Sequence, residues 1–291
     1  MKTIKLILVA VLVSTVIFGS RAQKHKLVAN TKGYAKLNEV KMYYELYGEG
    51  PPIILLHGAY MTIDGMMRDY AADLSKTHKV IITEFQGHGR TPDVPGRDIT
   101  YEGLADDVAD LLKYLKIERA DILGYSLGGG VALQVAIRHP SMVNKLVCIS
   151  GSYSDEGMQP AFKPLLDKMT VQQFDGTPFK TDYERIAPNK NDFPILFEKL
   201  KKLDVTHFNW ENEYKQIKSP MLLIFGDGDI ITIDHISSML KLPGGNQPTD
   251  LGYKNNVHLA ILPNTSHVDM MKRLSWISPM LKDFLNTKNS K

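Results

Sequence analysis

The chain has 291 residues, of which 43% are hydrophobic and 23% are charged, and its formal net charge at pH 7 is +3. This composition is ordinary for a globular protein with one large domain, and it excludes a disordered chain. The sequence has no long basic run and no stretch that interleaves basic and aromatic residues, so it gives no indication of nucleic-acid binding. The single cysteine, Cys148, excludes an intrachain disulfide and is expected to be a small buried hydrophobic residue.

The first 22 residues have the pattern of a secretory signal peptide. Lys2 and Lys5 open an apolar stretch that ends at Phe18, and Ser20 and Ala22 place small residues at the −3 and −1 positions of a cleavage site after Ala22. The apolar stretch is shorter than the roughly 18 residues that a membrane-spanning helix needs, so no stable membrane anchor is expected. We expect a secreted or periplasmic protein.

Strand and helix patterns alternate from residue 34 to residue 150. Alternating polar and apolar residues over 34–47 predict a hairpin, and apolar runs at 53–56, 80–83, 121–123 and 145–150 predict buried strands. Helices are predicted near 66–74 and over 101–115, where apolar residues recur at helical spacing. This order is typical of an α/β fold with a mostly parallel, doubly wound sheet.

A serine stands in the middle of a glycine-rich turn at residues 124–128. The sequence Ile-Leu-Gly-Tyr-Ser-Leu-Gly-Gly-Gly over 122–130 places Ser126 between an apolar strand and a helical run over 131–136. In a nucleophile elbow of this kind the serine hydroxyl stands clear of the sheet. Gly124 and Gly128 allow neighbouring backbone to approach closely. Ser126 is therefore the candidate nucleophile.

The strand–helix alternation stops between Gly151 and Lys218. Helical patterns occur there around 164–169, 194–203 and 210–217. The segment is rich in aromatic residues: Phe174, Phe179, Phe193, Phe197, Phe208 and Trp210. These rings either line an apolar substrate site or form the small core of this segment.

Two strand ends further along the chain supply the other groups that a serine nucleophile needs. The apolar run 221–225 ends in Gly-Asp-Gly-Asp, which contains Asp227 and Asp229, and the run 259–262 leads into a loop that ends at His267. The order serine, acid, histidine occurs in known catalytic triads. Because the carboxyl ends of parallel strands meet at one crevice, we expect these side chains to converge. The residues alone leave the choice between the two aspartates open.

From Pro52 to His267 the chain resembles the α/β-hydrolase fold superfamily. The resemblance rests on the Gly-Tyr-Ser-Leu-Gly elbow, the His-Gly loop at 57–58, the Gln-Gly-His-Gly-Arg-Thr loop at 86–91 and the Gly-Asp-x-Asp pattern. It implies that Asp229 is the triad acid and that Asp227 caps local backbone N–H groups in a turn. It also implies an oxyanion hole formed by the backbone N–H groups of Ala59 and Leu127.

The resemblance further implies a domain organisation and the roles of the other histidines. A signal peptide (1–22) would precede a hydrolase core in two parts (23–151 and 219–291), with a helical cap (152–218) inserted after strand six. His57 and His88 would be structural. The remaining histidines are expected to be solvated or locally bonded: His78, His139, His207, His235 and His258.

The chemistry expected of these residues is acyl transfer. Ser126 would attack a small ester, lactone or thioester, while His267, oriented by Asp229, would take and return the proton. A dehalogenase or epoxide hydrolase of this fold would carry aspartate at position 126, and the loop at 59–60 lacks the glycines of many lipases. We expect a small-molecule acyl substrate, no cofactor and no metal; the sequence does not indicate an oligomeric state.

Two alternatives stay open at this point. One is a cofactor-free perhydrolase or carbon–carbon bond hydrolase that uses the same triad. The other is a ligand-binding protein in which the triad is idle.

Overall fold

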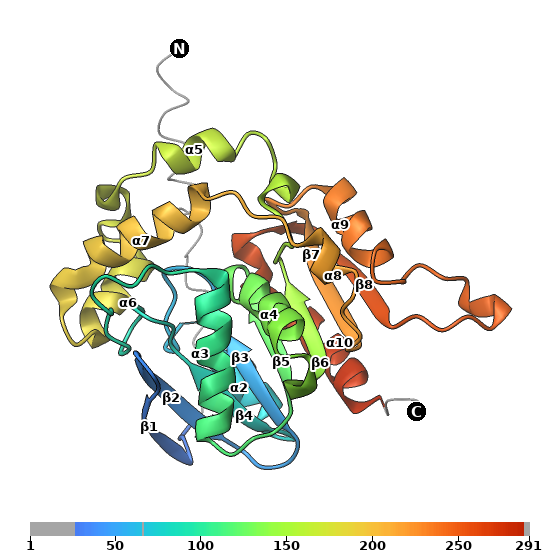
Figure 1. Cartoon of the computed structure of the whole chain (residues 1–291), viewed down its shortest axis with the longest axis horizontal. Coiled ribbons are helices and arrows are strands. Elements are labelled where there is room, and N and C mark those ends of the chain that lie inside the picture. The colour runs from blue at the N-terminus through green and yellow to red at the C-terminus, as the bar shows by residue number, and fades with distance from the viewer. Residues whose placement is uncertain (1–26, 66, 288–291) are drawn as a thin grey trace.

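The computed structural model describes residues 27–65 and 67–287, so the predicted signal peptide lies outside the described residues. In this part of the chain an eight-stranded sheet has the order β1-β2-β4-β3-β5-β6-β7-β8 (Figure 1). The strands are β1 (Thr31–Lys36), β2 (Lys41–Tyr47), β3 (Pro52–Leu56), β4 (Lys79–Thr83), β5 (Ala120–Tyr125), β6 (Val143–Ile149), β7 (Met221–Gly228) and β8 (Val257–Ser266). β2 pairs antiparallel with β1 and β4, and the remaining neighbours are parallel. The predicted hairpin and the predicted mostly parallel α/β fold are thus confirmed.

Helices cover both faces of this sheet. They are α2 (Met67–Leu74), α3 (Tyr101–Tyr114), α4 (Leu127–Arg138), α5 (Lys163–Asp167), α6 (Pro178–Ile186), α7 (Phe193–Val205), α8 (Glu211–Tyr214), α9 (Ile233–Lys241) and α10 (Leu274–Asn286). Alternate side chains of a strand point to opposite faces. On β3, Ile54 and Leu56 share a hydrophobic cluster with α3 and α4, whereas Ile53 and Leu55 share one with α2 and α10. Because both faces are buried, the central strands are continuous apolar runs in the sequence.

The segment between β6 and β7 contains α5, α6, α7 and α8, and Figure 1 shows the first three of these helices together above the sheet. Its aromatic side chains pack on one another: the ring of Phe174 lies 5.6 Å from that of Phe193 and 5.8 Å from that of Phe197. Tyr60, from the loop after β3, packs against Phe174 at 4.5 Å. These rings therefore form the core of the segment and its contact with the sheet domain. That the segment acts as a cap stays a prediction.

Two further features of the described residues bear on the sequence analysis. None of the helices in this part of the chain has the length and apolar character needed to cross a membrane. Cys148 lies in β6 with no exposed surface, as expected.

Candidate active site

The turn from β5 into α4 holds Ser126 in a conformation that few residues other than glycine adopt. Its backbone has φ 55° and ψ −117°, which places a residue with a Cβ in an unfavourable region. The flanking glycines make the turn possible. A Cβ on Gly124 would lie 1.9 Å from the carbonyl oxygen of Gly128, and one on Gly128 would lie 2.3 Å from the carbonyl oxygen of Leu56. The structure therefore has the strained elbow that the sequence predicts.

The structure brings together the three residues predicted to form a triad. The Oγ of Ser126 lies 2.9 Å from Nε2 of His267, and Nδ1 of His267 lies 2.8 Å from Oδ1 of Asp229. The residues come from the ends of β5, β8 and β7, and 141 positions separate the serine from the histidine. Ser126 and His267 are partly accessible, whereas the side chain of Asp229 is fully buried.

Asp229 is ionised because several donors surround its carboxylate. Oδ2 accepts the hydroxyl of Ser150 at 2.5 Å, and the backbone N–H groups of Gly226 and Ile231 lie 3.5 and 3.4 Å from the two oxygens. Burial acts to raise the pKa of Asp229, but the hydrogen bonds from His267 and Ser150 and the charge of His267 outweigh it, so the pKa is lowered. Ser150 is a site residue that the sequence analysis missed. Its one sequence signal is its position directly after the apolar run of β6.

The loop that carries His267 is fixed from two neighbouring segments. The hydroxyl of Tyr125, next to the nucleophile, donates to the carbonyl oxygen of His267 at 2.9 Å. The carboxylate of Asp227 accepts the backbone N–H groups of Asn264 at 2.9 Å and Thr265 at 3.1 Å, and these bonds lower its pKa. The backbone N–H groups of Asp227 and Gly228 also lower this pKa, so Asp227 caps local groups, as expected, and in addition binds two residues of β8. Because β7 and β8 are parallel neighbours, the loop after one strand lies beside the end of the other.

The predicted oxyanion donors lie on two segments that touch. Leu127 is the first residue of α4, and the first N–H groups of a helix have no acceptor within the helix. Ala59 follows the His-Gly pair after β3, where a Cβ on Gly58 would lie 3.0 Å from the ring of Tyr125. No acceptor is found among the described residues for the N–H of Ala59. The oxyanion role of both groups stays a prediction that this arrangement permits.

His57 is a structural residue, as predicted. Its Nε2 accepts the backbone N–H of Phe85 at 3.1 Å, so its Nδ1 carries the proton and donates to the carbonyl oxygen of Gly58 at 2.8 Å. Burial lowers the pKa of His57 to about 4. The ring of His88 packs beside it, with centroids 4.9 Å apart. His235 differs from the prediction: it is buried, and its Nε2 lies 2.8 Å from Oγ of Ser152.

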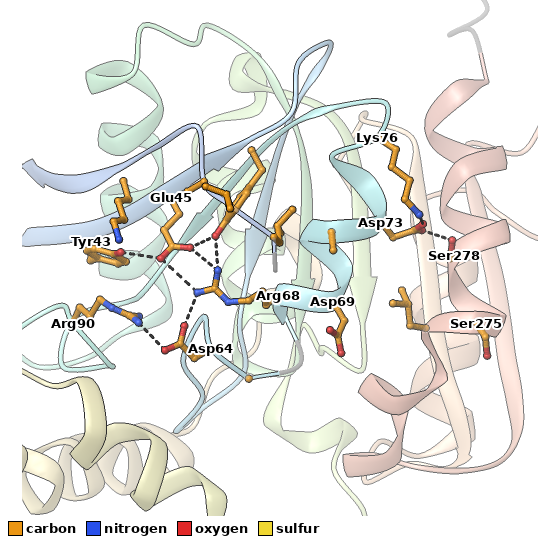
Figure 2. A pocket seen from close by; sticks show the side chains of 18 of the residues that line it. Tyr43, Glu45, Asp64, Arg68, Asp69, Asp73, Lys76, Arg90, Ser275 and Ser278 are labelled. Atoms are coloured by element: carbon orange, nitrogen blue, oxygen red, sulfur yellow. Dashed lines mark hydrogen bonds and ion pairs between the residues drawn. The ribbon is translucent and has the colours of Figure 1, made fainter. Parts of the chain in front are cut away.

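Behind the loop at 57–65, a network of ion pairs holds that loop in place. The buried carboxylate of Glu84 accepts the N–H of Ile63 at 3.0 Å and the guanidinium of Arg90 at 2.9 Å. Asp64 accepts Arg90 at 2.7 Å, and Figure 2 shows it between Arg90 and Arg68. Asp64, Arg68 and Arg90 line one wall of a cavity of about 1570 Å³ that reaches α10. The triad residues do not line this cavity, and its central charges pair with one another, so we assign the network a structural role.

No cluster of three or more His, Cys, Asp or Glu side chains suited to a metal ion is present in residues 27–65 and 67–287.

The comparisons with known proteins agree with this geometry. Residues 51–190 match the family model described as the alpha/beta hydrolase fold. Over 110 residues the chain is 38% identical to an uncharacterized protein of Mycobacterium tuberculosis, a match that covers 37% of this chain but only 31% of that relative. It is 25% identical over 264 residues to pimeloyl-[acyl-carrier protein] methyl ester esterase of Nitrosospira multiformis, covering 81% of this chain and 94% of the esterase.

A solved structure shows the same fold over nearly its whole length. Est816, described as an N-acyl homoserine lactone degrading enzyme, superposes with a TM-score of 0.66 at 25% identity, covering 86% of this chain and 99% of Est816. The sheet order, the elbow at Ser126, the family model and relatives that are themselves hydrolases all agree. The chain belongs to the α/β-hydrolase fold superfamily.

Proposed function

We propose that this protein is a serine hydrolase that cleaves a small ester, lactone or thioester. The observation that carries the proposal is the continuous line of hydrogen-bonding atoms from Ser126 through His267 to the buried Asp229, with separations of 2.9 and 2.8 Å. A serine hydroxyl is a weak nucleophile at neutral pH, and a base within hydrogen-bonding distance activates it. The buried carboxylate holds the imidazole with Nδ1 protonated, which leaves Nε2 free to accept the serine proton.

The reaction follows from these positions. Oγ of Ser126 attacks the carbonyl carbon while Nε2 of His267 takes the proton, and the N–H groups of Ala59 and Leu127 receive the charge that develops on the carbonyl oxygen. The imidazolium, stabilised by Asp229, then protonates the leaving group, and an acyl-enzyme forms. Water attacks this ester in the second half-reaction, with His267 again as the base.

The relatives support a carboxylic ester or lactone as the substrate class. One is named as a methyl ester esterase, and the solved structure is described as a lactone-degrading enzyme. Residues 152–218 would form the cap on the substrate side, since Phe174 of that segment packs on Tyr60, the neighbour of Ala59. The pattern of residues 1–22 supports a secreted or periplasmic location for this activity.

Hydrolysis of p-nitrophenyl esters of increasing acyl length tests the proposal. We expect saturable turnover by the purified protein and a loss of at least about 1000-fold in kcat for Ser126→Ala, since the oxyanion donors and binding still act in the variant. Ser152→Ala is the matched control, because Oγ of Ser152 also lies 2.8 Å from a histidine nitrogen, Nε2 of His235. Among the described residues, however, no carboxylate is paired with His235, so this serine and histidine do not form a triad. The control variant should keep kcat within about tenfold of the wild type.

Two results would contradict the proposal. Turnover that survives Ser126→Ala would remove the serine from the chemistry. Absence of turnover above the variant for every ester would favour a carbon–carbon bond hydrolase or a ligand-binding protein instead.

A further inference from the structure

A carboxylate lies on the buried face of helix α7. Phe193, Phe197 and Leu200 are buried along this helix, and Asp204 follows them at spacings of 11, 7 and 4 residues, which place it on the same side. Phe193 and Phe197 face Tyr60, with ring centroids 6.1 and 6.4 Å from its ring. The last turn of α7 therefore directs an acidic side chain toward the aromatic contact between the 152–218 segment and the loop after β3.

This carboxylate has no partner among the described residues. Two lysines of α7 are paired with aspartates outside the helix: Lys199 with Asp93 at 2.8 Å, and Lys202 with Asp98 at 2.5 Å. Asp204 makes neither a hydrogen bond nor an ion pair in the described part of the chain, although it keeps some accessible surface. Burial raises its pKa to about 7, with no cation to oppose that effect. An unpaired acidic group in such a place is costly to the fold, and function is the usual reason to retain one.

A second polar group without a partner lies nearby. Tyr60 is only 8% exposed, and its buried hydroxyl finds no hydrogen-bond partner in residues 27–65 and 67–287. Burial first, and then the negative charge of Asp204, raises the pKa of Tyr60, and the same two causes raise that of Tyr101. The carboxylate thus lies near both tyrosines. Buried polar groups are normally paired, so two unpaired ones in the same neighbourhood point to a ligand there.

Both tyrosines belong to segments that contact the elbow: Gly58 packs against Tyr125, and Gly130 packs against Tyr101. Tyr60 follows Ala59, the predicted oxyanion donor. A Cβ on Gly130 would lie 2.5 Å from the ring of Tyr101, and the N–H of Gly130 donates to the carbonyl oxygen of Ser126 at 3.1 Å. The ring of Tyr101 therefore packs on α4 about one helical turn beyond Ser126.

The surroundings favour a cation over an anion. Tyr101 packs against two further rings, those of Phe208 and Trp210, both at 5.0 Å, and ring faces attract positive charge. The other charged groups that act on Tyr60 and Tyr101 are all acidic: Glu198, Glu102 and Asp155. We propose that Asp204, Tyr60 and Tyr101 form a subsite beside Ser126 that binds a positively charged nitrogen group of the substrate. The proposal rests on the proposed function, because it places the charged group on a substrate of Ser126.

Two esters of equal shape test the charge requirement. The first is 4-nitrophenyl 4-(trimethylammonio)butanoate; the second, 4-nitrophenyl 5,5-dimethylhexanoate, replaces the nitrogen by carbon. We expect Asp204→Asn to lower kcat/KM for the cationic ester by about 10- to 100-fold, the range for a contact with a charged group. It should change kcat/KM for the neutral ester less than about twofold. Asp167→Asn is the matched control, since it makes the same substitution at an exposed position of α5 in the same segment, and it should leave the ratio of the two esters unchanged.

A binding measurement separates this proposal from the proposed function. Calorimetric titration of the Ser126→Ala variant with 4-(trimethylammonio)butanamide, which has no ester to cleave, should show binding that Asp204→Asn weakens by the same factor. If neither ester is hydrolysed but this binding is found, the subsite stands and the esterase proposal fails. An ester ratio that Asp204→Asn leaves unchanged, or binding of the amide that the substitution leaves unchanged, would overturn the subsite. Thermal unfolding shows that the variant is folded, and Asp204→Asn should not lower Tm, because it removes an unpaired buried charge.

Discussion

Replacement of Asp229 by asparagine tests the triad most directly, because its neighbour Asp227 offers a control two positions away. In the wild type, the two oxygens of Asp229 accept from four donors: His267 and Ile231 on Oδ1, and Ser150 and Gly226 on Oδ2. Asparagine offers one oxygen and one NH₂ group, so one side of the side chain must present donors to donors. If the NH₂ group faces His267, the imidazole changes tautomer, and Nε2 then carries a proton and is unable to take the one from Ser126.

The expected loss follows from this change of tautomer. An asparagine at the acid position of a serine triad lowers kcat by about 10⁴-fold, which corresponds to about 5.4 kcal/mol of transition-state stabilisation at 1.36 kcal/mol per tenfold. If the asparagine oxygen faces His267 instead, the hydroxyl of Ser150 is able to rotate and accept from the NH₂ group, and part of the activity returns. The measured loss of kcat therefore distinguishes the two orientations. The double variant Asp229→Asn, Ser150→Ala should show the larger loss, because it has no hydroxyl at position 150 to accept from the NH₂ group.

The assay is kcat for the best p-nitrophenyl ester, with circular dichroism to show that each variant is folded. Asp227→Asn should lose less than about tenfold, because Asp227 is exposed and accepts backbone N–H groups, including those of Asn264 and Thr265 at the end of β8, and not the imidazole of His267. A larger loss for Asp227→Asn than for Asp229→Asn, with both proteins folded, would refute the assignment of the acid.

Two further predictions concern the elbow and the buried His57. Gly124→Ala should lower the free energy of unfolding in urea by at least about 3 kcal/mol, because its Cβ would lie 1.9 Å from a backbone oxygen. Gly33→Ala is the control: nothing lies within 4 Å of a Cβ there, so this variant should stay within about 0.5 kcal/mol of the wild type. Equal effects of the two substitutions would contradict the close packing at the elbow. The pKa of His57 is lowered from 6.5 to about 4, so the unfolded chain binds a proton at this residue before the folded chain does as the pH falls. The free energy of unfolding of the wild type should therefore decrease by about 3 kcal/mol between pH 6.5 and 4 because of His57. The His57→Gln variant should lack this decrease, and both proteins keep the neighbouring His88. If the free energies of unfolding of the two proteins fall in parallel over that pH range, the reasoning is wrong.

The sequence was sufficient for the residues whose signal is local. The apolar runs predicted β3 to β8 because strands that are buried on both faces need apolar residues throughout. The elbow was visible because its glycines and serine lie within five consecutive residues. Helices α6, α9 and α10 were not predicted, and α6 has a polar composition with Tyr183 as its buried residue, so its helical pattern is weak.

The parts of the site that were missed depend on contacts between distant segments. Ser150 and Asp229 are 79 residues apart, and Tyr125 and His267 are 142 apart. Nothing next to Ser150 or Tyr125 in the sequence indicates these partners, because the parallel sheet alone brings the strand ends together. Asp204 was missed for a different reason: at the end of a helix with several lysines it has the pattern of a solvated residue, and only the packing of α7 on Tyr60 shows where it lies.

The position of Cys148 gives the protein an internal reporter of opening. It is the single thiol of the chain, it lies fully buried in β6, and burial raises its pKa to about 12. Its Sγ would be 2.7 Å from a Cβ on Gly151, so it is packed against the backbone just beyond Ser150. A thiol in that state does not react with a disulfide reagent until the surrounding structure opens. The rate at which such a reagent labels the native protein therefore measures how often the sheet opens beneath the triad, and a ligand that closes the site should slow the labelling.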